Sequence, residues 1–213
     1  MEHKANKPSP KLLIVTGPQG SGNHMFAKIF NMHPAVRGWR MQWREWQGHH
    51  LEPFAEYWQD PTKLANFDPG EYENFTTSIS CPYWKDQQPQ TPKYQEFIQE
   101  AKKYFQVKIL VIARDRHILK LQQQRVRGSH TTPEFIKQLE NLEDVNFVSH
   151  EALYLYQGKY LESLSKQLDF PIAHNHTTLL NDWFKKDANT KYITNVEQGG
   201  FDEQAIKASL QDS

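Results

Sequence analysis

Short apolar runs alternate along the chain with stretches that carry an apolar residue every three or four positions. Residues 107–113 (VKILVIA) and 11–16 (KLLIVT) are the most clearly apolar runs, and each is followed by polar or turn residues. Such runs predict buried strands. Weaker runs predict further strands at 75–80, 145–149 and 190–196.

The stretches between these runs have helical spacing. In the first, Met25, Phe26, Ile29 and Phe30 fall on one face. We expect helices at about 23–32, 92–105, 117–127, from Thr132 onward, 151–168 and 202–211. In the helix at 151–168 the expected inward residues are Leu153, Tyr156, Tyr160, Leu161, Leu164 and Leu168. Strands that alternate with helices predict an α/β fold of three layers, a parallel sheet flanked by helices.

The length of 213 residues suits one domain. Residues 1–10 are polar and are expected to form a flexible lead. Residues 11–213 then form a single α/β domain, with an insertion rich in Trp and His around 37–75. Within it, 37–60 has no clean period and is expected to be a helical or irregular cap over the sheet edge.

The charge balance limits the possible partners. Lys plus Arg equals Asp plus Glu, 25 each, which argues against a general binder of nucleic acid or anionic membranes. No apolar run approaches the roughly 20 residues of a membrane span. The one cysteine, Cys81, allows no internal disulfide. We therefore expect a cytoplasmic protein.

A glycine-rich turn carries the candidate chemistry. Gly17-Pro18-Gln19-Gly20-Ser21-Gly22 lies between the first strand and the first helix. Glycines allow successive backbone N–H groups to converge on one point, and the helix start adds free N–H groups and its positive dipole end. The turn predicts a site for a phosphate or sulfate group. The alternative is a tight turn that is glycine-rich for steric reasons alone.

The turn differs from the P-loop of kinases, G-x-x-x-x-G-K-[ST]. Gly17 and Gly22 match, but Asn23 replaces the lysine and His24 replaces the Ser/Thr. That lysine contacts the β- and γ-phosphates and the hydroxyl holds Mg²⁺. The pattern favours an anion site that needs no magnesium.

Three segments together resemble the P-loop sulfotransferases. Carbohydrate members often show G-P-Q-K-[ST]-G-T-[ST] at the turn, followed by a His-Pro that falls here at His33-Pro34. Their 3′-phosphate motif, a strand ending in R-[DN]-P-x-x-R-x-x-S, is similar to residues 111–122. Their later Y-E-x-L segment is similar to residues 147–171. The resemblance spans residues 11–171.

The resemblance implies a P-loop NTPase-like fold and a sulfotransferase. The donor would be 3′-phosphoadenosine 5′-phosphosulfate (PAPS), the acceptor a hydroxyl of a small molecule or glycan, and no metal would be required. The residues that it assigns to donor binding are Gly17, Pro18, Gln19, Gly20, Ser21, Gly22, Asn23, His24, Arg114 and Gln122.

The sequence also departs from that family. Gly20 stands where the family has the lysine that contacts the transferring sulfate, and His24 stands at a hydroxyl position. In the 3′-phosphate motif Arg116, Leu119 and Gln122 replace Pro, Arg and Ser. The cations and imidazoles that can compensate are His24, Lys28, Arg37, Arg40 and Arg116.

The resemblance and the residue chemistry suggest several candidates for the base. Glu45 follows Arg44 as in a family Lys-Glu pair, with a solvated surface charge as the alternative. His50 and its neighbour His49 suit base chemistry near neutral pH, or are a partly exposed pair. His24 is the third catalytic candidate. The Trp-rich segment is either a sugar-stacking platform or core, and no ligand spacing predicts a metal site.

Two other functions stay open. One is a nucleotide kinase or NTPase with an eroded Walker A motif. The other is a nucleotide-binding module without turnover.

Overall fold

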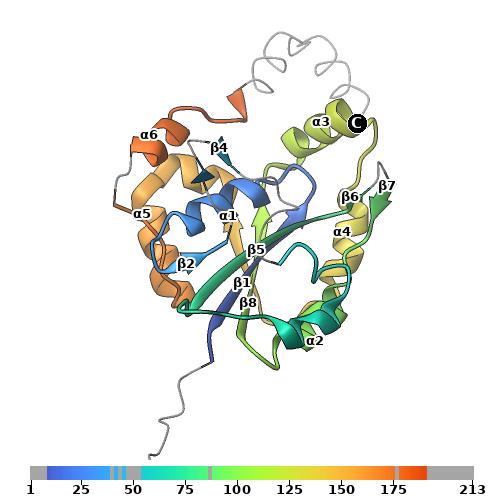
Figure 1. Cartoon of the computed structure of the whole chain (residues 1–213). Coiled ribbons are helices and arrows are strands. Elements are labelled where there is room, and N and C mark those ends of the chain that lie inside the picture. Colours follow the sequence, from blue (N-terminus) through green and yellow to red (C-terminus); the bar gives the residue numbers. More distant parts are fainter. Residues whose placement is uncertain are drawn as a thin grey trace, which may run out of the picture.

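A computed structural model describes residues 9–38, 41–42, 45–46, 54–85, 88–175 and 178–190. Its centre is a five-stranded parallel sheet in the order β2-β5-β1-β8-β9 (Figure 1). The strands are β1 (Lys11–Pro18), β2 (Val36–Arg37), β5 (Asn74–Cys81), β8 (Gln106–Ala113) and β9 (Val145–Ser149). Two short antiparallel ribbons accompany the sheet, β3 (Met41–Gln42) with β4 (Glu45–Trp46), and β6 (Tyr83–Lys85) with β7 (Gln88–Gln90).

The helices cover both faces of the sheet, with α1 and α5 on one side and α2 and α4 on the other (Figure 1). Their bounds are α1 (Asn23–Asn31), α2 (Tyr94–Ala101), α3 (Arg116–Arg127), α4 (Thr132–Leu139), α5 (His150–Leu168) and α6 (Thr178–Phe184), with a 3₁₀ turn, η2, at Pro61–Asn66. The expected α/β fold, a parallel sheet flanked by helices, is confirmed.

The alternation of β1 side chains produces the two cores. Leu12 and Ile14 pack with the α2 and α4 side, whereas Leu13 and Val15 pack with α1 and α5. All four side chains are fully buried. A central parallel strand that is apolar on both faces is what a sheet with two helical layers requires.

The order of the strands defines the position of a ligand site. From β1 the chain moves toward β2 on one side, whereas from β8 it moves to β9 on the other. In open α/β sheets, ligands bind outside the carboxyl ends of the strands where the winding reverses in this way. The loop after β1 and Arg114 after β8 meet at that point.

One expectation for α5 was wrong. Tyr156, expected to point inward, is 63% exposed, because Gln157 has non-helical angles (φ 49°, ψ −125°) that shift the phase of α5. Helix α4 begins at Thr132 as expected, and its N-cap Thr131 makes no capping hydrogen bond with its side chain.

Described parts of the insertion at 37–75 belong to the main sheet and to the core rather than to a cap over the sheet edge. Val36–Arg37 is an edge strand of the main sheet. Trp58 is core: its ring stacks on Phe97 with centroids 3.8 Å apart, and its Nε1 donates to Thr77 Oγ1 at 3.0 Å. The strand and helix expected at 190–196 and 202–211 lie almost wholly outside the described residues. None of the helices that the structure describes has the length and apolar character to cross a membrane.

Candidate functional site

A cavity of about 380 Å³ opens at the carboxyl ends of β1 and β8. Seven of the residues assigned to donor binding line it. These are Gln19, Gly20, Gly22, Asn23 and His24 around the turn, with Arg114 after β8 and Gln122 from α3. Gly17, Pro18 and Ser21 do not, since Gly17 and Pro18 end strand β1 and Ser21 is fully buried. The structure therefore brings together two segments that are almost 100 positions apart in the sequence.

The turn depends on two glycines in the left-handed region. Gly20 has φ 87° and Gly22 has φ 107°, values that side chains of L-residues rarely allow. Gly22 is the N-cap of α1 and supplies no side chain to cap it, and the first turn of α1 carries no acidic residue. The start of α1 thus has neither a side chain on its N-cap residue nor a carboxylate in its first turn, as in helix ends that bind anions.

The inner side of the turn is filled by its own side chains. Ser21 Oγ donates to Asn23 Oδ1, and Asn23 Nδ2 donates to the carbonyls of Gly17 and Ile79, both at 3.3 Å. A Cβ on Gly17 would lie 2.6 Å from Ser21 Oγ. The residue that replaces the kinase lysine therefore ties the turn to β5.

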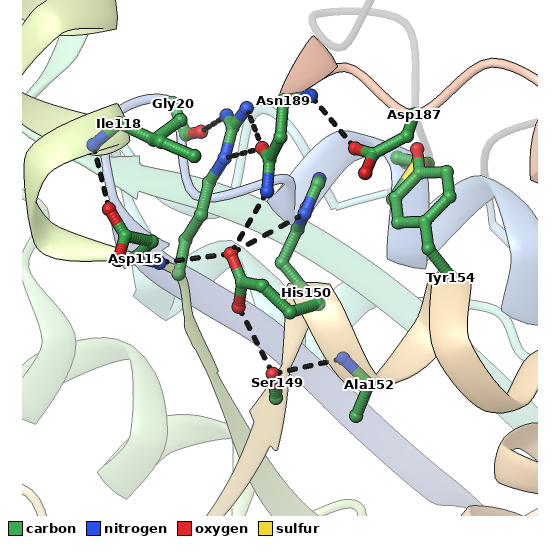
Figure 2. A network of polar contacts seen from close by, with 12 residues as sticks. Gly20, Asp115, Ile118, Ser149, His150, Ala152, Tyr154, Asp187 and Asn189 are labelled. Atoms are coloured by element: carbon green, nitrogen blue, oxygen red, sulfur yellow. Dashed lines mark hydrogen bonds and ion pairs between the residues drawn. The ribbon is translucent and has the colours of Figure 1, made fainter. Parts of the chain in front are cut away.

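Arg114 connects three parts of the chain. Its Nη1 donates to the carbonyl of Gly20 at 2.5 Å and to Gln122 Oε1. Its Nε and Nη2 donate to Asn189 Oδ1 at 2.9 and 2.6 Å. Figure 2 labels Gly20 and Asn189, the two residues whose carbonyl and side-chain oxygens accept from this guanidinium. The cation is thus held beside the turn by a residue that no motif indicated.

The geometry explains why residue 20 is not a lysine. A Cβ on Gly20 would lie 3.1 Å from both Cδ and Nε2 of Gln122, and the positive φ adds strain. Because Gln122 uses its Oε1 to accept from Arg114, its Nε2 is the end left to donate. Gly20 and Gln122, two of the departures from the family pattern, therefore lie against each other.

Gln123 holds the turn from its outer side. No sequence motif predicted this residue. It is 1% exposed, its Nε2 donates to the carbonyl of Gln19 at 2.7 Å, and its Oε1 accepts from the Thr131 N–H at 2.9 Å. The available signal was its spacing of four from Leu119, which places both residues on one face of α3.

Glu151 ties the strand ends together. Its Oε1 accepts from the N–H of Asp115 at 2.9 Å and from Asn189 Nδ2 at 3.2 Å, and its Oε2 accepts from Ser149 Oγ at 3.1 Å. Burial raises the pKa of this carboxyl, but these hydrogen bonds and one from its own N–H lower the pKa below the ordinary value overall. Glu151 is therefore ionised at neutral pH.

His150, also missed, lies in the wall of the cavity and is 2% exposed. Burial and then the charge of Arg114 lower the pKa of its imidazole to about 4, against smaller opposing effects of Glu151 and Asp187. The ring is therefore neutral at neutral pH. His150 directly precedes Glu151 in the segment that resembles Y-E-x-L, and this position is the feature of the sequence that could have identified it.

The described part of the chain allows only one of the three predicted bases to be placed relative to the cavity. His24 lines it. Glu45 lies in β4, where its backbone pairs with Gln42, and its side chain is outside the described part. His50 is also outside the described residues.

Of the cations expected to compensate, Arg116 is exposed at the start of α3, and Lys28 lies on α1, where burial lowers its pKa. Arg37 lies in the edge strand β2, and Arg40 is outside the described residues. Among the described residues no group of three or more His, Cys, Asp or Glu side chains could hold a metal ion.

Comparison with protein-family models gives no match to this chain, and no curated protein matches it either. The resemblance to sulfotransferases is therefore a hypothesis that the site itself must support.

Proposed function

We propose that the cavity binds PAPS and that the chain transfers its sulfuryl group to a hydroxyl of a small molecule or glycan. One observation carries the proposal. A turn with two left-handed glycines leads into α1, whose N-cap is a glycine and whose first turn has no acidic residue, and opens on a cavity that also contains Arg114. Together these supply N–H donors and one cation, the groups that bind a phosphosulfate.

The lining of the cavity fits an anion that comes without a metal. Its volume is within the usual range for small-molecule sites, roughly 300–1,000 Å³. No Asp or Glu is among the described residues that line it, so none of these residues offers a carboxylate that would repel the anion or bind magnesium. The resemblance assigns the turn to the 5′-phosphosulfate, and Arg114 with Gln122 to the 3′-phosphate.

The groups that would bind the donor also suit the transfer of its sulfuryl group. The oxygen of the acceptor hydroxyl forms a bond to sulfur, and the bond from sulfur to the bridging phosphate oxygen breaks. The electron pair stays on that phosphate oxygen, where N–H donors and a nearby cation stabilise the growing charge. The hydroxyl proton passes to a base.

Calorimetry tests the proposal directly. We expect adenosine 3′,5′-bisphosphate, the donor product, to bind with the same affinity with and without Mg²⁺. We expect ATP to bind more weakly and to gain nothing from Mg²⁺. Tight binding of ATP that requires magnesium, with none of the bisphosphate, would indicate the eroded NTPase instead.

The arrangement of Arg114 and Gly20 favours a second candidate, a nucleotide-binding module without turnover. Four hydrogen bonds to protein acceptors already hold the guanidinium, and residue 20 has no side chain to contact a transferring sulfate. This candidate predicts bisphosphate binding without transfer. Incubation with ³⁵S-labelled donor and a panel of glycans and simple alcohols separates the two.

Restoring a lysine at position 20 needs a companion change. Gly20→Lys alone places a side chain at positive φ against Gln122. The double variant Gly20→Lys/Gln122→Ala removes the steric conflict. A higher affinity of this variant for PAPS than of Gln122→Ala would place residue 20 at the anion.

A further inference from the structure

One ring nitrogen of His150 has no hydrogen-bond partner in the described part of the chain. His150 begins α5 and lines the cavity beside Gly22 and Arg114. Its Nδ1 is buried and makes no hydrogen bond to any residue that the structure describes. Burying a polar group without a partner is unfavourable, so a buried imidazole of this kind in a cavity wall requires an explanation.

The ring has two distinct sides. Nδ1 lies 4.0 Å from Glu151 Oε1. The opposite edge faces the turn, since a Cβ on Gly22 would lie 2.8 Å from Cδ2 and 3.5 Å from Nε2 of His150. The imidazole thus stands between a carboxylate and the proposed anion site.

The carboxylate is fixed in place. Three groups, the Asp115 N–H and the side chains of Asn189 and Ser149, donate to Glu151, and Figure 2 shows these groups around His150. An ionised carboxylate on the Nδ1 side favours the tautomer that carries its proton on Nδ1. Nε2 is then left with a lone pair on the side of the turn, as in other pairs of imidazole and carboxylate.

We propose that His150 is the general base of the sulfuryl transfer and that Glu151 is its positioning residue. The inference rests on the proposed function. As the acceptor oxygen bonds to sulfur and the bridging S–O bond breaks, the hydroxyl proton moves to Nε2 of His150. After product release the proton passes to solvent.

The charges around His150 link its basicity to the donor. Arg114 from the end of β8, Glu151 and Tyr154 from α5, Asp187 after α6 and His24 from α1 surround the ring or share its cavity. In the free protein the imidazole is neutral and can accept a proton. A phosphosulfate anion beside it stabilises the protonated form, so His150 becomes a stronger base when donor is bound.

Titration of His150 by NMR tests its place at the anion. The probe is adenosine 3′,5′-bisphosphate, and the His150 signal is assigned from its loss in His150→Gln. We expect the pKa of His150 to rise by about one unit or more with the probe bound. The NMR signal of the exposed His117 on α3 serves as the internal control. An unchanged His150 pKa in the bound protein overturns the inference.

Transfer assays test the role itself. His150→Gln keeps a side chain that can hydrogen-bond but cannot take the proton. We expect it to bind the bisphosphate as the wild type does, while transfer falls roughly 10²- to 10⁴-fold. The matched control His117→Gln should keep full transfer. Glu151→Gln should lower transfer less and shift its pH profile, which a purely structural role would not do.

The failures are distinguishable. If the wild type does not bind the bisphosphate, the proposed function fails and this inference fails with it. If it binds but transfers to no acceptor, the module without turnover is correct and no base exists. If His150→Gln transfers normally, or loses binding as much as transfer, only the assignment of His150 is wrong.

Discussion

The turn after β1 and the group of side chains around Arg114 border the same cavity, but they keep their shape in different ways. The turn is backbone held at positive φ by glycines, with Ser21 and Asn23 filling its inner side. The Arg114 group consists of side chains from the position after β8, from α3 and from the segment after α6, joined by hydrogen bonds. A short sequence motif can therefore identify the turn. The Arg114 group is assembled only by the fold.

Among the substitutions that test this difference, we expect a change at Gly22 to have the largest effect on stability and binding. Gly22→Ala forces a side chain into a left-handed conformation, at about 1–3 kcal/mol, and places its Cβ 2.8 Å from His150. We expect the loss of unfolding free energy to exceed that strain and bisphosphate binding to disappear. Denaturant unfolding and calorimetry measure both.

Gly70→Ala is the matched control. Gly70 also has a positive φ, 57°, but a Cβ added there would have no other atom within 4 Å. We expect only the conformational cost and unchanged binding. Equal losses in the two variants would mean that contact between the turn and His150 contributes nothing.

His150 predicts a pH dependence of stability. Its pKa is about 4 in the folded protein and about 6.5 when unfolded. The unfolded chain therefore takes up the proton first, so stability is full above pH 6.5, falls as the pH drops, and levels off below pH 4. The loss amounts to about 3 kcal/mol.

Unfolding curves at several pH values, compared between wild type and His150→Gln, isolate this contribution from that of the carboxylates. The wild type should lose more stability between pH 6.5 and 4. Parallel curves for the two proteins would show that the imidazole is not buried in its neutral form.

Arg114→Met tests the side-chain half of the cavity. It removes the cation and its charged hydrogen bonds, each worth about 1.5–3 kcal/mol. We expect bisphosphate affinity to fall by roughly tenfold or more. Arg116→Met removes an exposed cation two positions away and should bind normally. Similar losses in both variants would mean that long-range charge, rather than contact, governs binding.

Gln123→Ala gives the smallest expected effect. It removes the hydrogen bonds from Gln123 to the carbonyl of Gln19 and from the N–H of Thr131, both half-buried, at about 1 kcal/mol of unfolding free energy or somewhat more. Gln124→Ala, on the exposed side of α3, is the control and should be neutral. A neutral Gln123→Ala would show that the turn keeps its place without this clamp.

The strands and most helices followed from the sequence because their signals are local. β1, β5, β8 and β9 were each visible as short apolar or β-branched runs. The glycines of the turn were visible because backbone conformation depends on residue type. The expectation that Tyr156 points inward was wrong because no local sequence signal predicts the break in the helix at Gln157.

The rest of the site required the fold. Asn189 follows Arg114 by 75 positions and Gln123 follows Gln19 by 104, so no spacing rule connects them. In the sequence, only its place directly before Glu151 in the Y-E-x-L-like segment separates His150 from the other histidines. Its importance comes from burial against Gly22 and Glu151, which depends on how α5 packs beside the turn.

The most direct test of an anion site at this turn is an NMR titration of the backbone amides with adenosine 3′,5′-bisphosphate. We predict the largest shifts at the N–H groups of Gly20, Gly22, Asn23 and His24, together with the side-chain Nε–H of Arg114. Binding that leaves these amides unmoved and shifts others instead would contradict the account.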